Sequence, residues 1–248
     1  MSETDSTKSK KKLPIIAFLL PWRSKFNTNL TFIEFIKSRT FSISYLVIIW
    51  ILAVLLDFGS TRNCGPTWQL EFICQQSVWM GKMYSEPFNF IINTFISTFF
   101  HNGIDHILFV TIVGFIVIAQ SFEAQNSSRA TLFLFFSSMA FVCIFMGFII
   151  NWGYSNWPQI DYYSFAIERS WMGGSAGFFG VFGALTHNCR NKWIVPLIVV
   201  LFESINLFLL GIDPQISTAH ILATIYGLIV WGFWIKRKKK TNLLSHSV

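Results

Sequence analysis

Long apolar runs, separated by short polar segments, make up most of this chain. An α-helix needs about 20 predominantly apolar residues to cross the hydrocarbon core of a bilayer. The runs that approach this length are residues 41–58, 104–122, 130–150, 173–185 extended to about 189, 193–210 and 216–235. The pattern predicts an all-α membrane protein with a six-transmembrane-helix bundle, and this even number places both termini on one side of the membrane.

The predicted spans divide the chain into three parts. Residues 1–40 form a basic N-terminal segment, residues 41–235 the membrane domain, and residues 236–248 a basic tail. Within the first part, the apolar run 13–22 lies between prolines and is too short to span a bilayer. No small-residue cleavage site follows it, so we expect an interfacial helix there and not a signal peptide.

Two loops on the side opposite the termini are long and rich in aromatic residues. They cover about residues 59–103 and 151–171. Trp and Tyr favour the interface between lipid and water, so we expect both loops to lie at the membrane surface. The first should contain short helices, including one within "PFNFIINTFISTFF", whereas the second shows little helical periodicity.

The composition changes the picture by excluding an ordinary soluble domain. Hydrophobic residues make up 53% of the 248 residues and charged residues 12%, too little charge to cover so much apolar surface in water. The formal net charge of +7 comes mainly from "KSKKK" and "KRKKK" near the two ends. In so apolar a chain, such runs favour membrane lipids as the partner and argue against nucleic acid.

The distribution of basic residues predicts the orientation. Of the 19 Lys and Arg residues, 16 lie on the side of the termini: eight before the first span, Arg129 after the second, Arg190 and Lys192 after the fourth, and five after the sixth. Basic residues concentrate on the cytoplasmic side of membrane proteins. We therefore expect both termini in the cytoplasm, in a plasma membrane or a bacterial inner membrane.

The four cysteines show no metal-ligand spacing and so predict no metal site. Cys143 and Cys189 lie in or beside apolar runs and are interpreted as packing residues. Cys64 and Cys74 share the first outer loop, where a disulfide is an option if that loop faces an oxidising compartment.

Three polar side chains in the predicted spans are candidates for chemistry, because a polar or ionisable group in a membrane helix is costly. They are His106, Ser175 and His220. With the termini inside, the second, fourth and sixth spans all begin at the outer face, and each candidate lies within the first residues of its span. At about 1.5 Å per residue, all three reach a depth of roughly 5–10 Å.

Small residues at helical spacing would let the fourth and sixth spans approach closely. They are Gly173, Gly177, Gly180 and Ala184 on the fourth span, and Ala223 and Gly227 after His220 on the sixth. Ser175 and His220 would then come within hydrogen-bond reach. A serine activated by a histidine is a nucleophile and base pair.

The position of Ser175 adds a second element of this chemistry. In the first turn of its helix, backbone N–H groups lack intrahelical partners and can stabilise a developing oxyanion. His106 could donate a further hydrogen bond. The sequence thus predicts a dyad with an oxyanion hole and no evident acidic third member. His101 and His187 are interpreted as loop or interfacial residues, and Glu123 as a solvated or loop-pinning carboxylate.

These residues resemble the motifs of the rhomboid intramembrane serine proteases. The match rests on "FFHNGIDHILF" for a His-x4-His motif, "GGSAG" for the nucleophile motif and "AHILATIYG" for the motif of the last core span. With six spans in order, the resemblance covers about residues 41–235. It implies hydrolysis of a peptide bond in or near a transmembrane helix of a membrane-protein substrate, without a cofactor.

The resemblance also implies individual roles. Ser175 would be the nucleophile, His220 the general base, and His106 with the Ser175 amide the oxyanion hole. Gly173 would be the first glycine of the nucleophile motif, and Phe179 the ring that packs against the histidine. A mobile fifth span would admit the substrate.

The chain departs from the family pattern at several positions. Val110 stands where the family often has Asn, Ala176 and Ala223 replace glycines, and a Trp-Arg pair is missing near Ile92 and Asn93. None of these changes removes the dyad.

Other readings stay open. Ser175 alone could be a packing residue in a glycine-rich helix. A catalytically inactive rhomboid-like protein that binds transmembrane helices would fit Val110 and the missing Trp-Arg pair. A small transporter or channel that relays protons through His106 and His220 would fit the two histidines.

Overall fold

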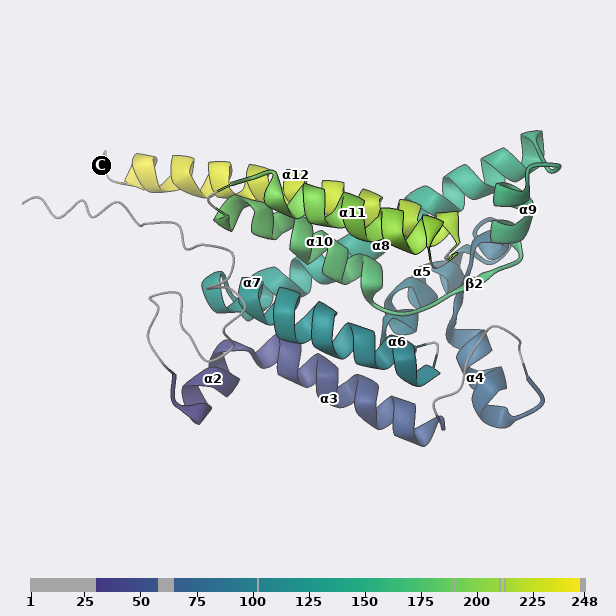
Figure 1. The fold of residues 1–248 in the computed structure, drawn as a ribbon, viewed down its shortest axis with the longest axis horizontal. Helices are drawn as coiled ribbons and strands as arrows, with labels where there is room; N and C mark the ends of the chain where they lie inside the picture. Colours follow the sequence, from purple (N-terminus) through teal and green to yellow (C-terminus); the bar gives the residue numbers. More distant parts are fainter. Residues whose placement is uncertain are drawn as a thin grey trace, which may run out of the picture.

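The computed structural model describes residues 30–57, 65–101, 103–189, 191–209, 211 and 213–245. The interfacial helix predicted at residues 13–22 lies outside these ranges. The chain is predominantly helical, and its long helices run roughly along one direction (Figure 1). Helix α2 and the end of α12 lie at one end of the bundle, whereas α4, α5, α9 and β2 lie at the other.

The helices and strands are short at the two ends of the bundle and long between them. The α-helices are α2 (Phe32–Ser38), α3 (Thr40–Leu55), α4 (Trp68–Gln76), α5 (Pro87–Ile96), α6 (Gly103–Phe109), α7 (Gln120–Gln125), α8 (Ser128–Asn156), α9 (Asp161–Ile167), α10 (Ser175–Leu185), α11 (Ile194–Phe208) and α12 (Pro214–Ser245). The 3₁₀ turns are η1 (Met80–Lys82), η2 (Ser97–Phe99) and η4 (Thr186–Asn188), and η3 (Val110–Ala119) is π-helical. Strands β1 (Val78–Trp79) and β2 (Ser170–Trp171) pair antiparallel.

Among the described residues, three helical segments are long and apolar enough to cross a membrane. They are Gly103–Gln125, Ser128–Asn156 and Pro214–Ile235, and α2 with α3 adds a fourth if this pair, bent by 85°, counts as one span. Helix α11 has 15 residues and α10 only 11, so α10 is about 16 Å long, roughly half the hydrocarbon thickness. The expectation of a helical membrane protein is confirmed, and the count of six spans stays a prediction.

The outward-facing surface of the bundle is apolar, as a lipid environment requires. Large hydrophobic side chains are exposed in series along α3, α8, α11 and α12; those on α11 include Leu197, Val200, Leu201, Ile205 and Phe208. Exposed apolar patches of this extent are rare on soluble monomers. They mark the surface that faces the bilayer.

The second predicted span is continuous, but its middle is a π-helix. Helix α6 passes into η3 and then α7 over Gly103–Gln125. Apolar runs predict burial in lipid and do not distinguish α from π winding, so this segment was not predictable from the sequence. A Cβ added at Gly114 in η3 would lie 2.8 Å from the ring of Phe178, so the glycine permits η3 to pack tightly against α10.

Glu123 anchors the start of α3. Its carboxylate accepts hydrogen bonds from the backbone N–H groups of Phe41 and Ser42 at 2.7 and 2.9 Å, and from the Ser42 hydroxyl at 2.6 Å. The first N–H groups of a helix have no intrahelical partner and favour negative charge. Glu123 is therefore buried and pins a helix start instead of a loop, and its interpretation as a solvated carboxylate is wrong.

The loop predicted at residues 151–171 is more ordered than its sequence pattern indicates. Helix α8 continues to Asn156, and α9 follows. The side-chain amide of Asn151 donates to the backbone oxygens of Gly147 and Met80, both at 2.7 Å, and Gly153 gives room for the ring of Tyr163. These tertiary contacts, which leave no periodic pattern, hold the additional helical turns.

The first outer loop contains the short helices α4 and α5 that were expected there. Cys74, in α4, is disulfide-bonded, and its expected partner Cys64 lies outside the described residues. Cys143 and Cys189 are both buried. A disulfide in this loop agrees with an oxidising compartment on its side of the membrane.

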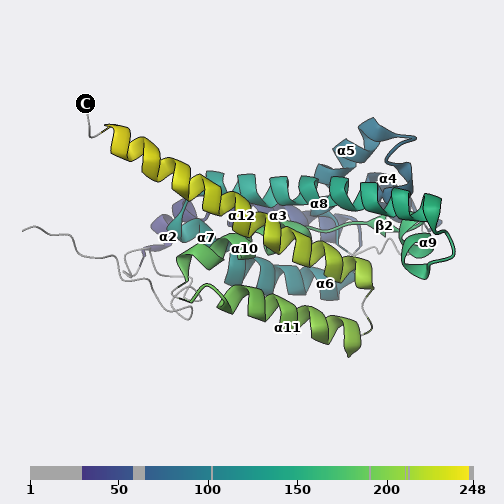
Figure 2. The same cartoon turned by 90° about the horizontal axis from the view of Figure 1, so that it is seen from above.

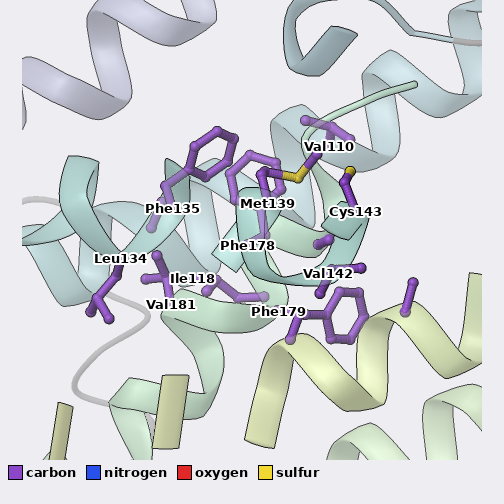
Figure 3. Packing of buried hydrophobic residues seen from close by; sticks show 14 of the residues in the cluster. Val110, Ile118, Leu134, Phe135, Met139, Val142, Cys143, Phe178, Phe179 and Val181 are labelled. Atoms are coloured by element: carbon purple, nitrogen blue, oxygen red, sulfur yellow. The ribbon is translucent and has the colours of Figure 1, made fainter. Parts of the chain in front are cut away.

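Helix α10 lies in the middle of the bundle and contacts α8, η3, α11 and α12 (Figure 2). Its glycines face neighbouring helices: a Cβ at Gly227 of α12 would overlap the carbonyl oxygen of Gly180, and a Cβ at Gly183 would overlap that of Thr224. The expected close approach of the two helices is confirmed. On the opposite side, Phe178 packs with Phe135 and Met139 of α8 (Figure 3).

Candidate functional site

Ser175 is the first residue of α10, shortly after strand β2. The chain enters α10 through Gly173, which has a positive φ of 91° and donates its N–H to the backbone oxygen of Ser97 at 2.9 Å. The N-cap is Gly174, which supplies no side-chain cap. Of the first-turn N–H groups of α10, which lack intrahelical partners, that of Gly177 donates to Sδ of Met139 at 3.2 Å, and Ser175 itself is half-buried.

His106 lies beside this turn. A Cβ added at Gly173 would be 2.7 Å from Cε1 of His106 and 3.5 Å from Nδ1 of His101. The two histidine rings are 5.0 Å apart, centroid to centroid, at 77°. Only glycine fits between the chain and these rings, since the position combines a positive φ with close contact.

His101 lies in the loop before α6, as expected, but its side chain is buried. Neither of its ring nitrogens has a hydrogen-bond partner among the described residues. Burial, with a smaller contribution from His106, lowers the pKa of His101 well below 6.5. The interpretation of His101 as a loop or interfacial residue did not include this burial, although His101 is the first histidine of the His-x4-His motif.

His220, on α12, lies against Phe179 of α10. Their rings stack with centroids 4.0 Å apart and 13° between planes. Phe179 follows Ser175 by one helical turn, so both side chains project from the same side of α10. In Figure 3, Phe179 points toward the neighbouring helix α12.

His220 has an acidic partner that the sequence analysis missed. Nδ1 of His220 lies 2.7 Å from Oε1 of Glu203 on α11, and both side chains are buried. The amide of Asn206 donates to the other carboxylate oxygen at 3.3 Å. The prediction of no acidic third member is therefore wrong.

A signal for Glu203 was present in the sequence. It is the one acidic residue in the predicted fifth span, residues 193–210, and an ionisable residue in a membrane span is a functional candidate by default. It lies seven residues before the outer end of that span, which corresponds to a depth of about 10 Å, close to that of His220. Counting depth from the outer ends of odd-numbered spans would have found it.

The remaining ring nitrogen of His220, Nε2, is buried and has no hydrogen-bond partner among the described residues. Within the same part of the chain, no hydrogen bond joins it to the Ser175 hydroxyl. The structure thus brings His106, Ser175 and His220 to one end of the α10 interface without closing the hydrogen bond between serine and histidine.

An elongated cavity of about 280 Å³ begins beside Ser175. It lies between the second span, α10 and α11, and its walls include Phe109, Val113, Phe179, Phe202 and, farther along, Cys189. Apart from the hydroxyls of Ser175 and Ser121, the side chains around it are apolar. Such a lining suits an apolar chain.

The other expected supporting residues occupy the α10–α12 contact and the core. Ala223 and Gly227 lie where α12 meets α10. Val110 is fully buried in the core. Asn93, at the position of the missing Trp-Arg pair, donates its amide to the backbone oxygens of Gln75 and Ser77 at 2.8 and 3.1 Å and so ties α5 to the preceding loop.

Among the described residues, no group of three or more His, Cys, Asp or Glu side chains is arranged to hold a metal ion. Comparison of the chain with protein-family models, curated proteins and solved structures returns no match.

Proposed function

We propose that this chain is a rhomboid-like intramembrane serine protease that cleaves peptide bonds in or near transmembrane helices of other proteins. Ser175 acts as the nucleophile and His220 as the general base. His106 and the backbone N–H of Ser175 form the oxyanion hole. The substrates are membrane proteins with transmembrane helices.

The observation that carries this proposal is the stack of Phe179 on His220. Because Phe179 lies one turn beyond Ser175, the stack puts the imidazole on the same side of α10 as the hydroxyl. Gly173, two residues before the serine, contacts His106. Along the segment from Gly173 to Phe179, Ser175 therefore lies between the contact with His106 and the contact with His220. A nucleophile needs this placement between its base and its oxyanion donor.

The proposed reaction needs only groups of this chain and water. As the Ser175 oxygen attacks the carbonyl carbon of the scissile bond, its proton passes to Nε2 of His220. The negative charge on the former carbonyl oxygen is stabilised by His106 and by the backbone N–H of Ser175. His220 then returns the proton to the leaving amine, and a water molecule, deprotonated by His220, releases the acyl group from Ser175.

The proposed topology has six spans, with α10 and α11 as the fourth and fifth and both termini in the cytoplasm. Helix α2 and the end of α12 share one end of the bundle (Figure 1), and Arg129, in the first turn of α8, belongs to the same group of basic residues. Concentration of positive charge at one end is the usual mark of the cytoplasmic side. The candidate site then faces the outside of a plasma or bacterial inner membrane.

The test is covalent labelling of the purified full-length protein with a fluorophosphonate, followed by cleavage of a panel of single-span model substrates. We expect labelling of the wild type and none of Ser175→Ala, with loss of cleavage in both Ser175→Ala and His220→Ala. Absence of labelling in the folded wild type would overturn the proposal and favour an inactive helix-binding protein, for which the apolar Val110 in the core is the supporting observation. Histidine-dependent proton flux in vesicles, unchanged by Ser175→Ala, would instead indicate a transporter.

A further inference from the structure

We propose that Glu203 is a positioning residue that completes an acid, histidine and serine triad across three helices, α11, α12 and α10. The inference rests on the proposed function of Ser175 and His220 and extends it. The observation behind it is the 2.7 Å contact between Glu203 Oε1 and His220 Nδ1.

Burial gives this contact its weight. The side chains of His220 and Glu203 are 7% and 3% exposed. Removing a carboxylate from water costs several kcal/mol unless hydrogen bonds and a partner charge offset the cost. Here the His220 ring is hydrogen-bonded to one carboxylate oxygen, and the Asn206 amide, one turn further along α11, donates to the other. The carboxylate is thus held on both oxygens and cannot turn away without leaving a buried acceptor unsatisfied.

The contact also fixes which nitrogen of His220 acts as the base. A carboxylate accepts hydrogen bonds and cannot donate them, so the neutral ring carries its proton on Nδ1, where it points to Glu203. The lone pair is then on Nε2, the nitrogen that has no partner among the described residues. An imidazole in this tautomer can accept the proton of the Ser175 hydroxyl without a prior rearrangement.

The charge of Glu203 would assist the same step. When Nε2 accepts the serine proton, the ring becomes a cation inside an apolar bundle. The nearby carboxylate then offsets this charge where water cannot, because the effective dielectric constant is low. His106, on α6, is another ionisable group close enough to interact electrostatically with His220, and it cannot supply negative charge.

A purely structural role must be distinguished from this one, since the pair also ties α11 to α12. The variants are Glu203→Gln, which removes the charge but keeps the shape, and Glu203→Asp, which keeps the charge on a shorter arm. Glu71→Gln makes the same chemical change on an exposed carboxylate of α4 and is the matched control. All are prepared as the full chain in the same detergent or bilayer as the wild type.

Two measurements follow on each variant. The first is the rate of fluorophosphonate labelling of Ser175. We expect Glu203→Gln to reduce it about 10- to 100-fold, within the range that a positioned base contributes, with partial recovery in Glu203→Asp and no change in Glu71→Gln. The second is the tautomer of His220, read by long-range ¹H–¹⁵N correlation in protein labelled with ¹⁵N-histidine. We expect a proton on Nδ1 in the wild type and a mixture of tautomers in Glu203→Gln.

Unchanged labelling and an unchanged tautomer in Glu203→Gln would overturn the role of Glu203. The role would also be overturned if the labelling rate fell equally in Glu203→Gln and Glu203→Asp and this fall matched their loss of thermal stability. The pair would then be only a structural tie between α11 and α12. If the wild type is not labelled, the proposed function fails, and the tautomer then decides separately whether Glu203 positions His220. If Glu203→Gln does not fold, the labelling rate and tautomer of Glu203→Asp relative to Glu71→Gln decide the question.

Discussion

The ring of Phe179 lies nearly parallel to the imidazole of His220, with the two centroids 4.0 Å apart. A parallel stack at this distance restricts the rotation of the imidazole about its side-chain bonds. Glu203 restricts the same ring from a different helix through Nδ1. Two independent contacts thus leave Nε2 as the nitrogen free to react.

We expect Phe179→Leu to lower the rate of Ser175 labelling by more than its loss of stability explains. Aromatic pairs contribute about 0.5–1.5 kcal/mol beyond their buried area, which corresponds to about a 2- to 12-fold loss of rate if the stack holds the base. Phe178→Leu, which removes a neighbouring buried ring that packs with Phe115 instead of His220, should cost similar stability and leave the rate unchanged. Equal rates in the two variants would exclude a role for the stack.

Gly173→Ala should disable the oxyanion side of the site. The added Cβ would press on the ring of His106 and would also require a positive φ. Loss of one oxyanion donor costs about 10²–10³-fold in other hydrolases, and we expect a decrease of this order in labelling rate. Gly211→Ala is the matched control, because that residue has a positive φ of 61° but its Cβ would meet nothing within 4 Å. A similar decrease in both variants would attribute the effect to backbone strain alone.

Gly227→Ala should destabilise the protein strongly, because its Cβ would overlap the backbone oxygen of Gly180 and force α10 and α12 apart. Gly232→Ala, on the same helix, meets only the side chain of His187. It should have a small effect, since it also gains up to about 1 kcal/mol of helix propensity. Melting temperatures of the two variants in one detergent test this difference, and equal values would show that the α10–α12 contact tolerates separation.

His101 should make the folded protein sensitive to acid. Its pKa is lowered by burial, so the folded state stays unprotonated while the unfolded state binds a proton below about pH 6.5. Stability is therefore retained above this pH and falls as the pH drops below it, by about 1.4 kcal/mol per pH unit for one such group. In His101→Gln this contribution to the slope should disappear. Unfolding measured between pH 7 and pH 5 tests the difference, and identical slopes in the two proteins would contradict the prediction.

Much of the bundle could be predicted from the sequence, because apolar length is a direct physical requirement of a bilayer. The apolar runs predicted the positions of α3, α8 and α12 to within a few residues at their N-terminal ends. Glycine spacing predicted the approach of α10 to α12. The π-helix η3 and helix α9 were not predictable, since winding and tertiary hydrogen bonds leave no repeating pattern in the sequence.

The candidate site was predictable in part. Ser175, His106 and His220 could be grouped because each lies near the outer start of an even-numbered span. Glu203 was missed because it lies near the outer end of an odd-numbered span. A residue late in such a span has the same depth as a residue early in an even-numbered span. The burial of His101 depends on the loop before α6, whose path the sequence does not specify.

Helix α11 carries both a wall of the elongated cavity and the carboxylate that holds His220. Phe202 lines the cavity and Glu203 follows it in the chain. A displacement of this helix that widens the cavity would therefore also separate Glu203 from the imidazole of His220. Substrate entry and proton transfer would then require two different positions of α11. For each turnover, the helix would have to return to its first position before the reaction begins.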